Sequence, residues 1–96
     1  MGFLFRRSAT DRIERVLAAH GAARCLAALE LLPWLTAHPE QIAAAWERCE
    51  LPLVQALPDC PPASKAPLLR ALENCSAACR NRDVARRIMV LRDSLV

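Results

Sequence analysis

The sequence predicts an all-α protein, a compact bundle of four to five short antiparallel helices in a single domain over residues 1–96. Apolar residues make up 54% of the chain, and among them are 18 Ala and 15 Leu, both strong helix formers. Residues that favour strands are scarce, with five Val, three Ile and no Tyr. Only two glycines are present, which leaves little material for hairpin turns.

The first helix is expected from about Thr10 to His20, because apolar residues recur there at helical spacing. Ser8 and Asp11 have the spacing of a capping box, and Gly21 stands where a left-handed residue ends many helices. The predicted inward residues are Ile13, Val16, Leu17 and His20.

The second helix is expected over residues 22–32, and a kink at Pro33 with continuation to Thr36 is left open. Its only charged residues are Arg24 and Glu30. A helix that is apolar on nearly every side is usually the most buried one. We therefore predict that this helix is central.

The third helix begins after His38, since Pro39 suits the first helical position. Pro52 is expected to end or kink it near Glu50, and residues 53–57 to form one further turn. The predicted inward residues are Ile42, Trp46, Cys49 and Leu53.

A proline-rich loop is expected over residues 58–63, followed by helices over about 64–79 and 82–95. Their apolar stripes are out of phase, which a turn near Asn81 in a left-handed conformation reconciles. One long helix with two different contact faces is the alternative. The inward residues of the fourth helix are Leu68, Leu72, Cys75 and Cys79, and those of the fifth are Val84, Ile88, Leu91 and Leu95.

The five cysteines are interpreted as free thiols, because no export signal precedes them and cytoplasmic thiols stay reduced. Cys25, Cys49, Cys75 and Cys79 fall on apolar faces and are expected to be core filler. Cys60 is expected to be an exposed, ordinary thiol in the loop. A metal site built on Cys75 and Cys79 is a third-ranked alternative, since only one such short spacing exists.

Neither membrane attachment nor catalysis is expected. No apolar stretch is long enough to span a bilayer, residues 1–8 are expected to be a flexible end, and the arginine-rich composition is typical of bacteria. His20 and His38 lack a neighbouring nucleophile motif, and two glycines exclude glycine-rich phosphate loops. We predict a cytoplasmic protein with no catalytic residue, no cofactor and no metal ligand.

Charge is unevenly distributed along the chain. Residues 1–24 hold five bases and two acids (+3), residues 25–63 one base and five acids (−4), and residues 64–96 seven bases and three acids (+4). This pattern suits intramolecular pairing or an acidic partner equally well. A small nucleic-acid-binding regulator that uses the two basic ends is therefore the second hypothesis, although aromatic residues for stacking are few.

The first hypothesis is a non-catalytic protein-interaction module, such as a small adaptor, assembly factor or inhibitor. The segment from Ile88 to Leu91 has a wider apolar arc than one core stripe requires, and arginines border it. The alternative is that a bundle so rich in apolar residues simply exposes some of them. Another protein or a second copy of the chain is expected to bind at Arg82, Arg86, Arg87, Met89 and Val90, with Trp34 as a second anchor.

Overall fold

The computed structural model describes residues 9–96 and confirms the all-α bundle. Five α-helices and two single 3₁₀ turns account for nearly all of this part of the chain, which contains no strand. The elements are α1 (Ala9–Ala18), α2 (Gly21–Thr36), η2 (Pro39–Gln41), α3 (Ile42–Ala56), η3 (Leu57–Asp59), α4 (Pro62–Ala78) and α5 (Arg82–Leu95).

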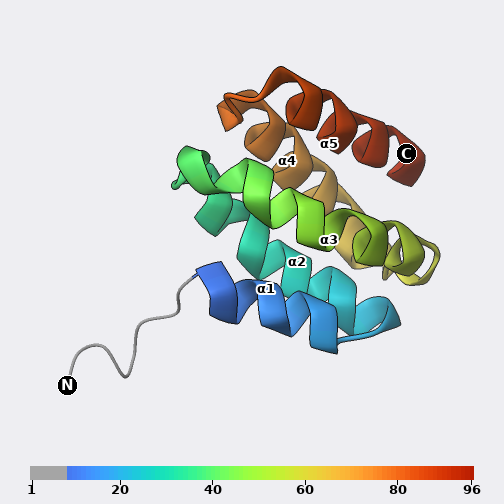
Figure 1. Cartoon of the computed structure of the whole chain (residues 1–96). Helices are drawn as coiled ribbons and strands as arrows, with labels where there is room; N and C mark the ends of the chain where they lie inside the picture. Colours follow the sequence, from blue (N-terminus) through green and yellow to red (C-terminus); the bar gives the residue numbers. More distant parts are fainter. Residues whose placement is uncertain (1–8) are drawn as a thin grey trace.

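The helices form two layers (Figure 1). In one layer α1, α2, α4 and α5 each pack against the next, and α3 lies across this layer in contact with α1, α2 and α5. Successive helices run in alternate directions (Figure 1). Because α2 packs against α1, α3 and α4 at once, the prediction of a central second helix is confirmed.

The predicted apolar stripes mostly face the core. All four inward residues of α3 and all four of α5 are buried, and Trp46 on α3 is among the largest side chains with almost no exposed surface. On α4 three of the four are buried, and Cys79 is half-buried at the end of the helix. On α1 Ile13 and Val16 are buried, whereas Leu17 is half-buried and His20 is exposed, so that stripe is narrower than predicted.

Three prolines lie inside helices that continue past them, namely Pro33 in α2, Pro52 in α3 and Pro67 in α4. Of the two outcomes expected at Pro52, an end of the third helix near Glu50 is wrong, because α3 runs through Pro52 to Ala56. A proline removes one intrahelical hydrogen bond, and here the burial of Leu53 and Ala56 beyond it holds the last turn in place. Similarly, α2 passes Pro33 and continues to Thr36, which settles the alternative left open.

The prediction of a loop over residues 58–63 is also wrong, since only Cys60 and Pro61 in this segment lie outside helical turns. The amide of Ser64 donates a hydrogen bond to the Pro61 carbonyl at 2.9 Å, which closes the first turn of α4. Proline is compatible with the first position of a helix because that position needs no amide donor, so Pro62 begins α4.

α4 and α5 are separate helices, but the expected left-handed Asn81 is wrong. Asn81 has φ −90° and ψ 112°, and its side-chain oxygen accepts a hydrogen bond from the Val84 amide at 3.1 Å. It is therefore the N-cap of α5 rather than a left-handed turn residue. Gly21 has the predicted positive φ, at +55°, at the junction between α1 and α2.

Some expectations concern residues outside the described part of the chain. These are the capping role of Ser8, the flexible end over residues 1–8 and the part of the basic N-terminal segment that contains Arg6 and Arg7. Within residues 9–96, no helix combines the length and the apolar character that crossing a bilayer requires.

Candidate interaction surface

The outward face of α5 carries most of the predicted partner-binding residues. Arg82, Arg86 and Val90 are exposed, and Met89 is half-buried beside them. At 3.6 residues per turn these four lie opposite the buried stripe of the same helix. Val90, the last of the four along the helix, exposes 59% of its surface. We call Arg82, Arg86, Met89 and Val90 the α5 face.

Ion pairs on both flanks fix α5 in place. Arg87 bonds both oxygens of the Glu50 carboxylate on α3, and its Nη1 lies 3.7 Å from Asp83 one turn earlier. On the other flank, the Nη1 atom of Arg92 lies 2.6 Å from Glu73 on α4. Arg87 is therefore engaged with the bundle itself and lies beside the α5 face rather than on it.

Trp34 lies elsewhere on the molecule. Its ring stacks on His38 with centroids 3.9 Å apart and planes at 15°, and the Arg12 guanidinium of α1 sits 5.2 Å from the ring centre. His38 is fixed in turn by a 2.8 Å hydrogen bond from its Nδ1 atom to the Trp34 carbonyl. Because α1 packs against α2 and α3 whereas α5 packs against α3 and α4, Trp34 and the α5 face are on different sides of the bundle.

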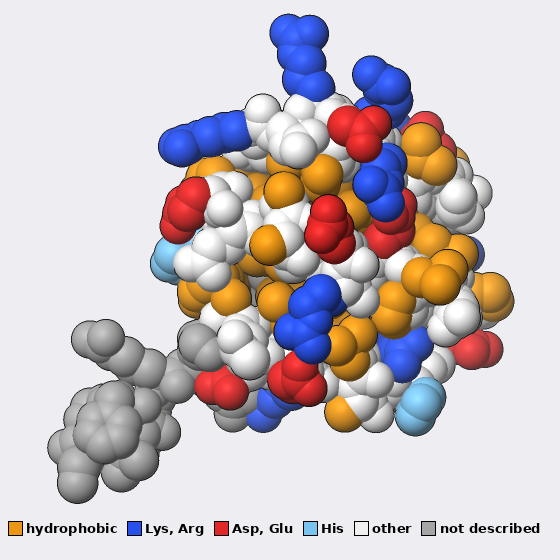
Figure 2. Space-filling view, viewed as in Figure 1, with side chains coloured by type: hydrophobic (Ala, Val, Ile, Leu, Met, Phe, Trp, Pro, Cys, Tyr) orange, Lys and Arg blue, Asp and Glu red, His pale blue; other side chains and the backbone are white. Residues whose placement is uncertain are grey.

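A second exposed apolar group was not predicted. Leu51 and Val54 on the outer side of α3 expose 66% and 46% of their surface. In Figure 2 hydrophobic side chains gather over the end of α3. The sequence analysis missed this group because Leu51 and Val54 stand close in sequence to residues of the inward stripe, Cys49 and Leu53. Apolar residues adjacent to that stripe do not by themselves indicate an exposed surface.

Ion pairs between helices join some of the basic residues near the two ends of the chain to acidic residues in its middle. Arg15 pairs with Glu30 at 2.7 Å, and the Arg87–Glu50 pair also joins a basic end of the chain to its acidic middle. A third pair, between Arg48 and Glu14 at 2.7 Å, ties α3 to α1. The basic ends are thus partly neutralised within the bundle.

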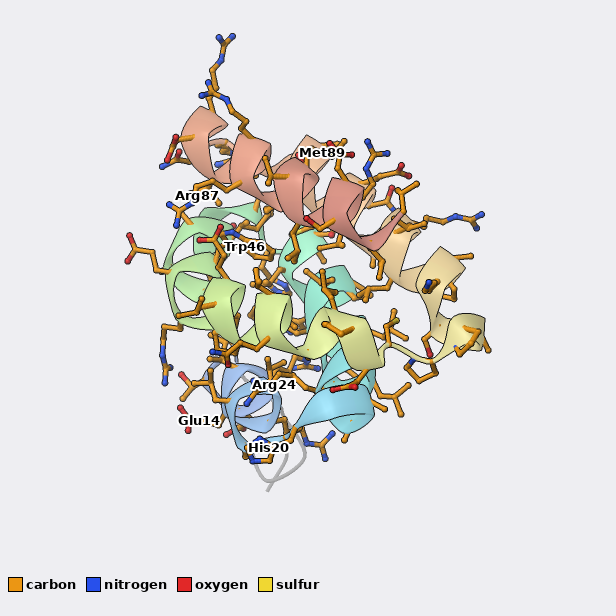
Figure 3. All side chains as sticks on the ribbon, turned by 90° about the vertical axis from the view of Figure 1, so that its right-hand side faces the viewer. Glu14, His20, Arg24, Trp46, Arg87 and Met89 are labelled. Atoms are coloured by element: carbon orange, nitrogen blue, oxygen red, sulfur yellow. The ribbon has the colours of Figure 1, made fainter. Side chains whose placement is uncertain are left out.

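Arg24 is a structural residue that the sequence did not single out. It is only 8% exposed, and its guanidinium donates hydrogen bonds to three backbone carbonyls. Nε and Nη2 reach Val16 and Leu17 in the last turn of α1 at 2.9 and 3.1 Å, and Nη1 reaches Pro52 in α3 at 3.1 Å. Figure 3 shows Arg24 between the ribbons of α1 and α3, far from Met89 on α5. A cation at the carboxyl end of α1 also complements the helix dipole.

The cysteines are unpaired thiols in mostly apolar surroundings. Burial raises the pKa of Cys49 to about 11 and that of Cys75 to about 12. Burial and the neighbouring Cys60 raise the pKa of Cys25 to about 11. The expectation that Cys60 is exposed is wrong, since it is buried between η3 and α4 and keeps only 7% of its surface open.

The third-ranked metal hypothesis gains no support from these positions. Among residues 9–96, no three His, Cys, Asp or Glu side chains are grouped so that they could hold a metal ion. Cys75 is buried in the core, whereas the Cys79 thiol donates to the Asn81 carbonyl at 3.4 Å at the end of α4.

Comparison with protein families, with curated proteins and with solved structures finds no match to this chain.

Proposed function

We propose that this chain is a non-catalytic protein-interaction module, a small adaptor, assembly factor or inhibitor, that docks through the α5 face. The observation that supports this is the 59% exposure of Val90 on a helix whose four inward residues already fill the core. Burying an exposed valine against a partner contributes up to about 1.5 kcal/mol to the free energy of binding. The isolated bundle does not gain this free energy.

The surroundings of Val90 fit an interface. Arg82 and Arg86 are exposed on the same face, and neither takes part in an ion pair within residues 9–96. Interfaces typically combine an apolar centre with arginine and a polar rim. Because Arg87 is held by Glu50 and Trp34 lies on another side of the bundle, the proposal rests on the α5 face alone.

Arg82 and Arg86 also favour the second hypothesis, a nucleic-acid-binding regulator. Unpaired arginines on one helix face suit contacts with phosphate. Four other arginines, Arg15, Arg48, Arg87 and Arg92, are paired with carboxylates and contribute less to such a surface. A protein partner therefore remains the first choice.

Affinity capture from the native host with the full chain as bait tests the proposal. Val90→Glu places a charge on the α5 face at its most exposed apolar residue, and Leu51→Glu is the matched control, since Leu51 is a similarly exposed apolar residue on α3. We expect specific partners, identified by mass spectrometry, to be lost with V90E and retained with L51E. Circular dichroism checks that both variants are folded, and light scattering detects self-association that V90E abolishes.

Two outcomes contradict the proposal. Partners that bind V90E as well as the unaltered chain would exclude the α5 face. Partners that disappear after nuclease treatment of the lysate would indicate the nucleic-acid hypothesis instead.

A further inference from the structure

Two cysteines that lie 35 positions apart in the chain meet inside the bundle. Cys25 on α2 is fully buried, and Cys60 is buried in the connection between η3 and α4, where η3 packs against α2. The Cys60 thiol donates a hydrogen bond to the Pro61 carbonyl at 3.6 Å, and Cys60 is near enough to contribute to the raised pKa of Cys25. Both are free thiols in the structure. This is a pair of side chains from different elements rather than neighbours on one helix.

The backbone around the pair is held together independently of the two sulfur atoms. The Cys25 Sγ also donates to the Ala56 carbonyl at 3.4 Å, at the end of α3. The Asp59 carboxylate packs against Gly21 at the start of α2, where an added Cβ atom would lie 3.4 Å from Oδ2. The turn that precedes Cys60 therefore packs against the first turns of α2.

The two thiols differ in access. Cys60 lines an open surface pocket of about 440 Å³, whose walls include Val54, Leu57, Lys65 and Val96. Cys25 is absent from this wall and has no exposed surface. A small oxidant that enters the pocket therefore meets Cys60 before Cys25.

We propose that Cys60 and Cys25 form a reversible two-cysteine redox switch that a hydroperoxide converts to a disulfide. The Cys60 sulfur attacks one peroxide oxygen, the O–O bond breaks, and the other oxygen leaves as water with the thiol proton. The resulting sulfenic acid is attacked by the Cys25 sulfur, its S–O bond breaks, and the oxygen leaves as a second water with the Cys25 proton. Two thiols thus lose two electrons and two protons, and one hydroperoxide is reduced.

The geometry favours this pair over the other cysteines. Cys75 and Cys79 are spaced i,i+4, where Cβ atoms are about 5–6 Å apart, whereas a disulfide needs about 3.5–4.5 Å. Cys60 and Cys25 belong to different elements that pack against each other, and Cys60 lies in the short connection outside both helical elements. The link would tie α2 to the start of α4 and close a long loop, which restricts the unfolded chain.

Treatment of the folded, full-length chain with hydrogen peroxide tests the switch. We expect the intact mass to fall by two hydrogen atoms and to recover with a reductant. Trypsin leaves Cys49 and Cys60 together in peptide 49–65, so a second cleavage before Asp59 is needed to assign the link. The cross-linked peptides should then contain Cys25 and Cys60, and the oxidised form should show a higher Tm that reverts on reduction.

Variants separate this inference from its alternatives. Cys79→Ser is the control and should still form the link. Cys25→Ser should instead leave Cys60 as a sulfenic acid that dimedone traps, and Cys25→Ala serves if the serine variant does not fold. A link between other cysteines, loss of two hydrogens in the C25S variant, or an unmodified Cys60 when Cys79 is oxidised would each overturn the proposal.

Discussion

Arg24 shows how one side chain joins segments that are distant in sequence. Its guanidinium occupies three carbonyl oxygens, two at the end of α1 and one at Pro52. Each of these oxygens is near the interior, where an unsatisfied acceptor costs about 1–3 kcal/mol. The position of α1 on α3 therefore depends on a residue of α2.

We predict that Arg24→Met lowers the free energy of unfolding by about 2–4 kcal/mol. Methionine keeps the apolar stem of the side chain but removes the guanidinium that donates to the three carbonyls. Urea denaturation measures the loss. Arg82→Met, at an exposed position on α5, is the control and should change stability by less than about 0.5 kcal/mol. Equal effects of the two substitutions would show that the buried hydrogen bonds are unimportant.

At the scale of elements, the boundary between α4 and α5 depends on a cap. Asn81 accepts a hydrogen bond from the amide of Val84 and so satisfies one of the free donors at the start of α5. The preceding helix ends at Ala78, so this cap lets a new helix begin after only three residues.

Replacing Asn81 by Ala should reduce stability by about 1 kcal/mol, because the Val84 amide loses its acceptor. Asn81→Asp keeps an acceptor and adds a negative charge at the positive end of the helix, so it should be neutral or stabilising. Chemical denaturation of both variants provides the measurement. A cost for N81D as large as that for N81A would contradict a capping role.

The sequence predicted most helices but not their ends. The bounds of α5 agree with the prediction, because Val84, Ile88, Leu91 and Leu95 repeat at an unambiguous spacing. Local rules failed at Pro52 and Cys60, where burial against other elements outweighs the preference of proline for a helix end or a loop. Tertiary contacts between distant segments leave no local pattern, so sequence spacing alone did not reveal the Cys25–Cys60 contact or the anchoring role of Arg24.

At the scale of the whole molecule, thiols dominate the titration of this protein in alkaline solution. The chain has five Cys, no Tyr and, at position 65, a single Lys, so few other groups change charge between pH 9 and 11. Burial raises the pKa of Cys49 from 9.0 to about 11 and that of Cys75 from 9.0 to about 12. Stability and pH are therefore coupled through residues on two different helices.

We predict that the free energy of unfolding, measured in urea with a reductant, falls as pH rises from 9 to 11. Well below pH 9 these thiols are protonated in both states and contribute no pH dependence. Above pH 9 the unfolded chain releases protons that the folded chain retains, so each thiol lowers stability by up to about 1.4 kcal/mol per pH unit. Cys49→Ala should flatten this slope, and a flat profile for the unaltered chain would contradict the buried thiols.

The two ion pairs that flank α5 have a consequence for recognition. Arg87 and Arg92 hold this helix against α3 and α4, so its backbone is already ordered before any partner arrives. In the proposed interaction, binding immobilises only a few side chains, at about 0.5–1.5 kcal/mol each, and no helix has to fold on contact. Preorganisation of this kind allows a short row of residues such as Arg86, Met89 and Val90 to sustain brief, reversible encounters.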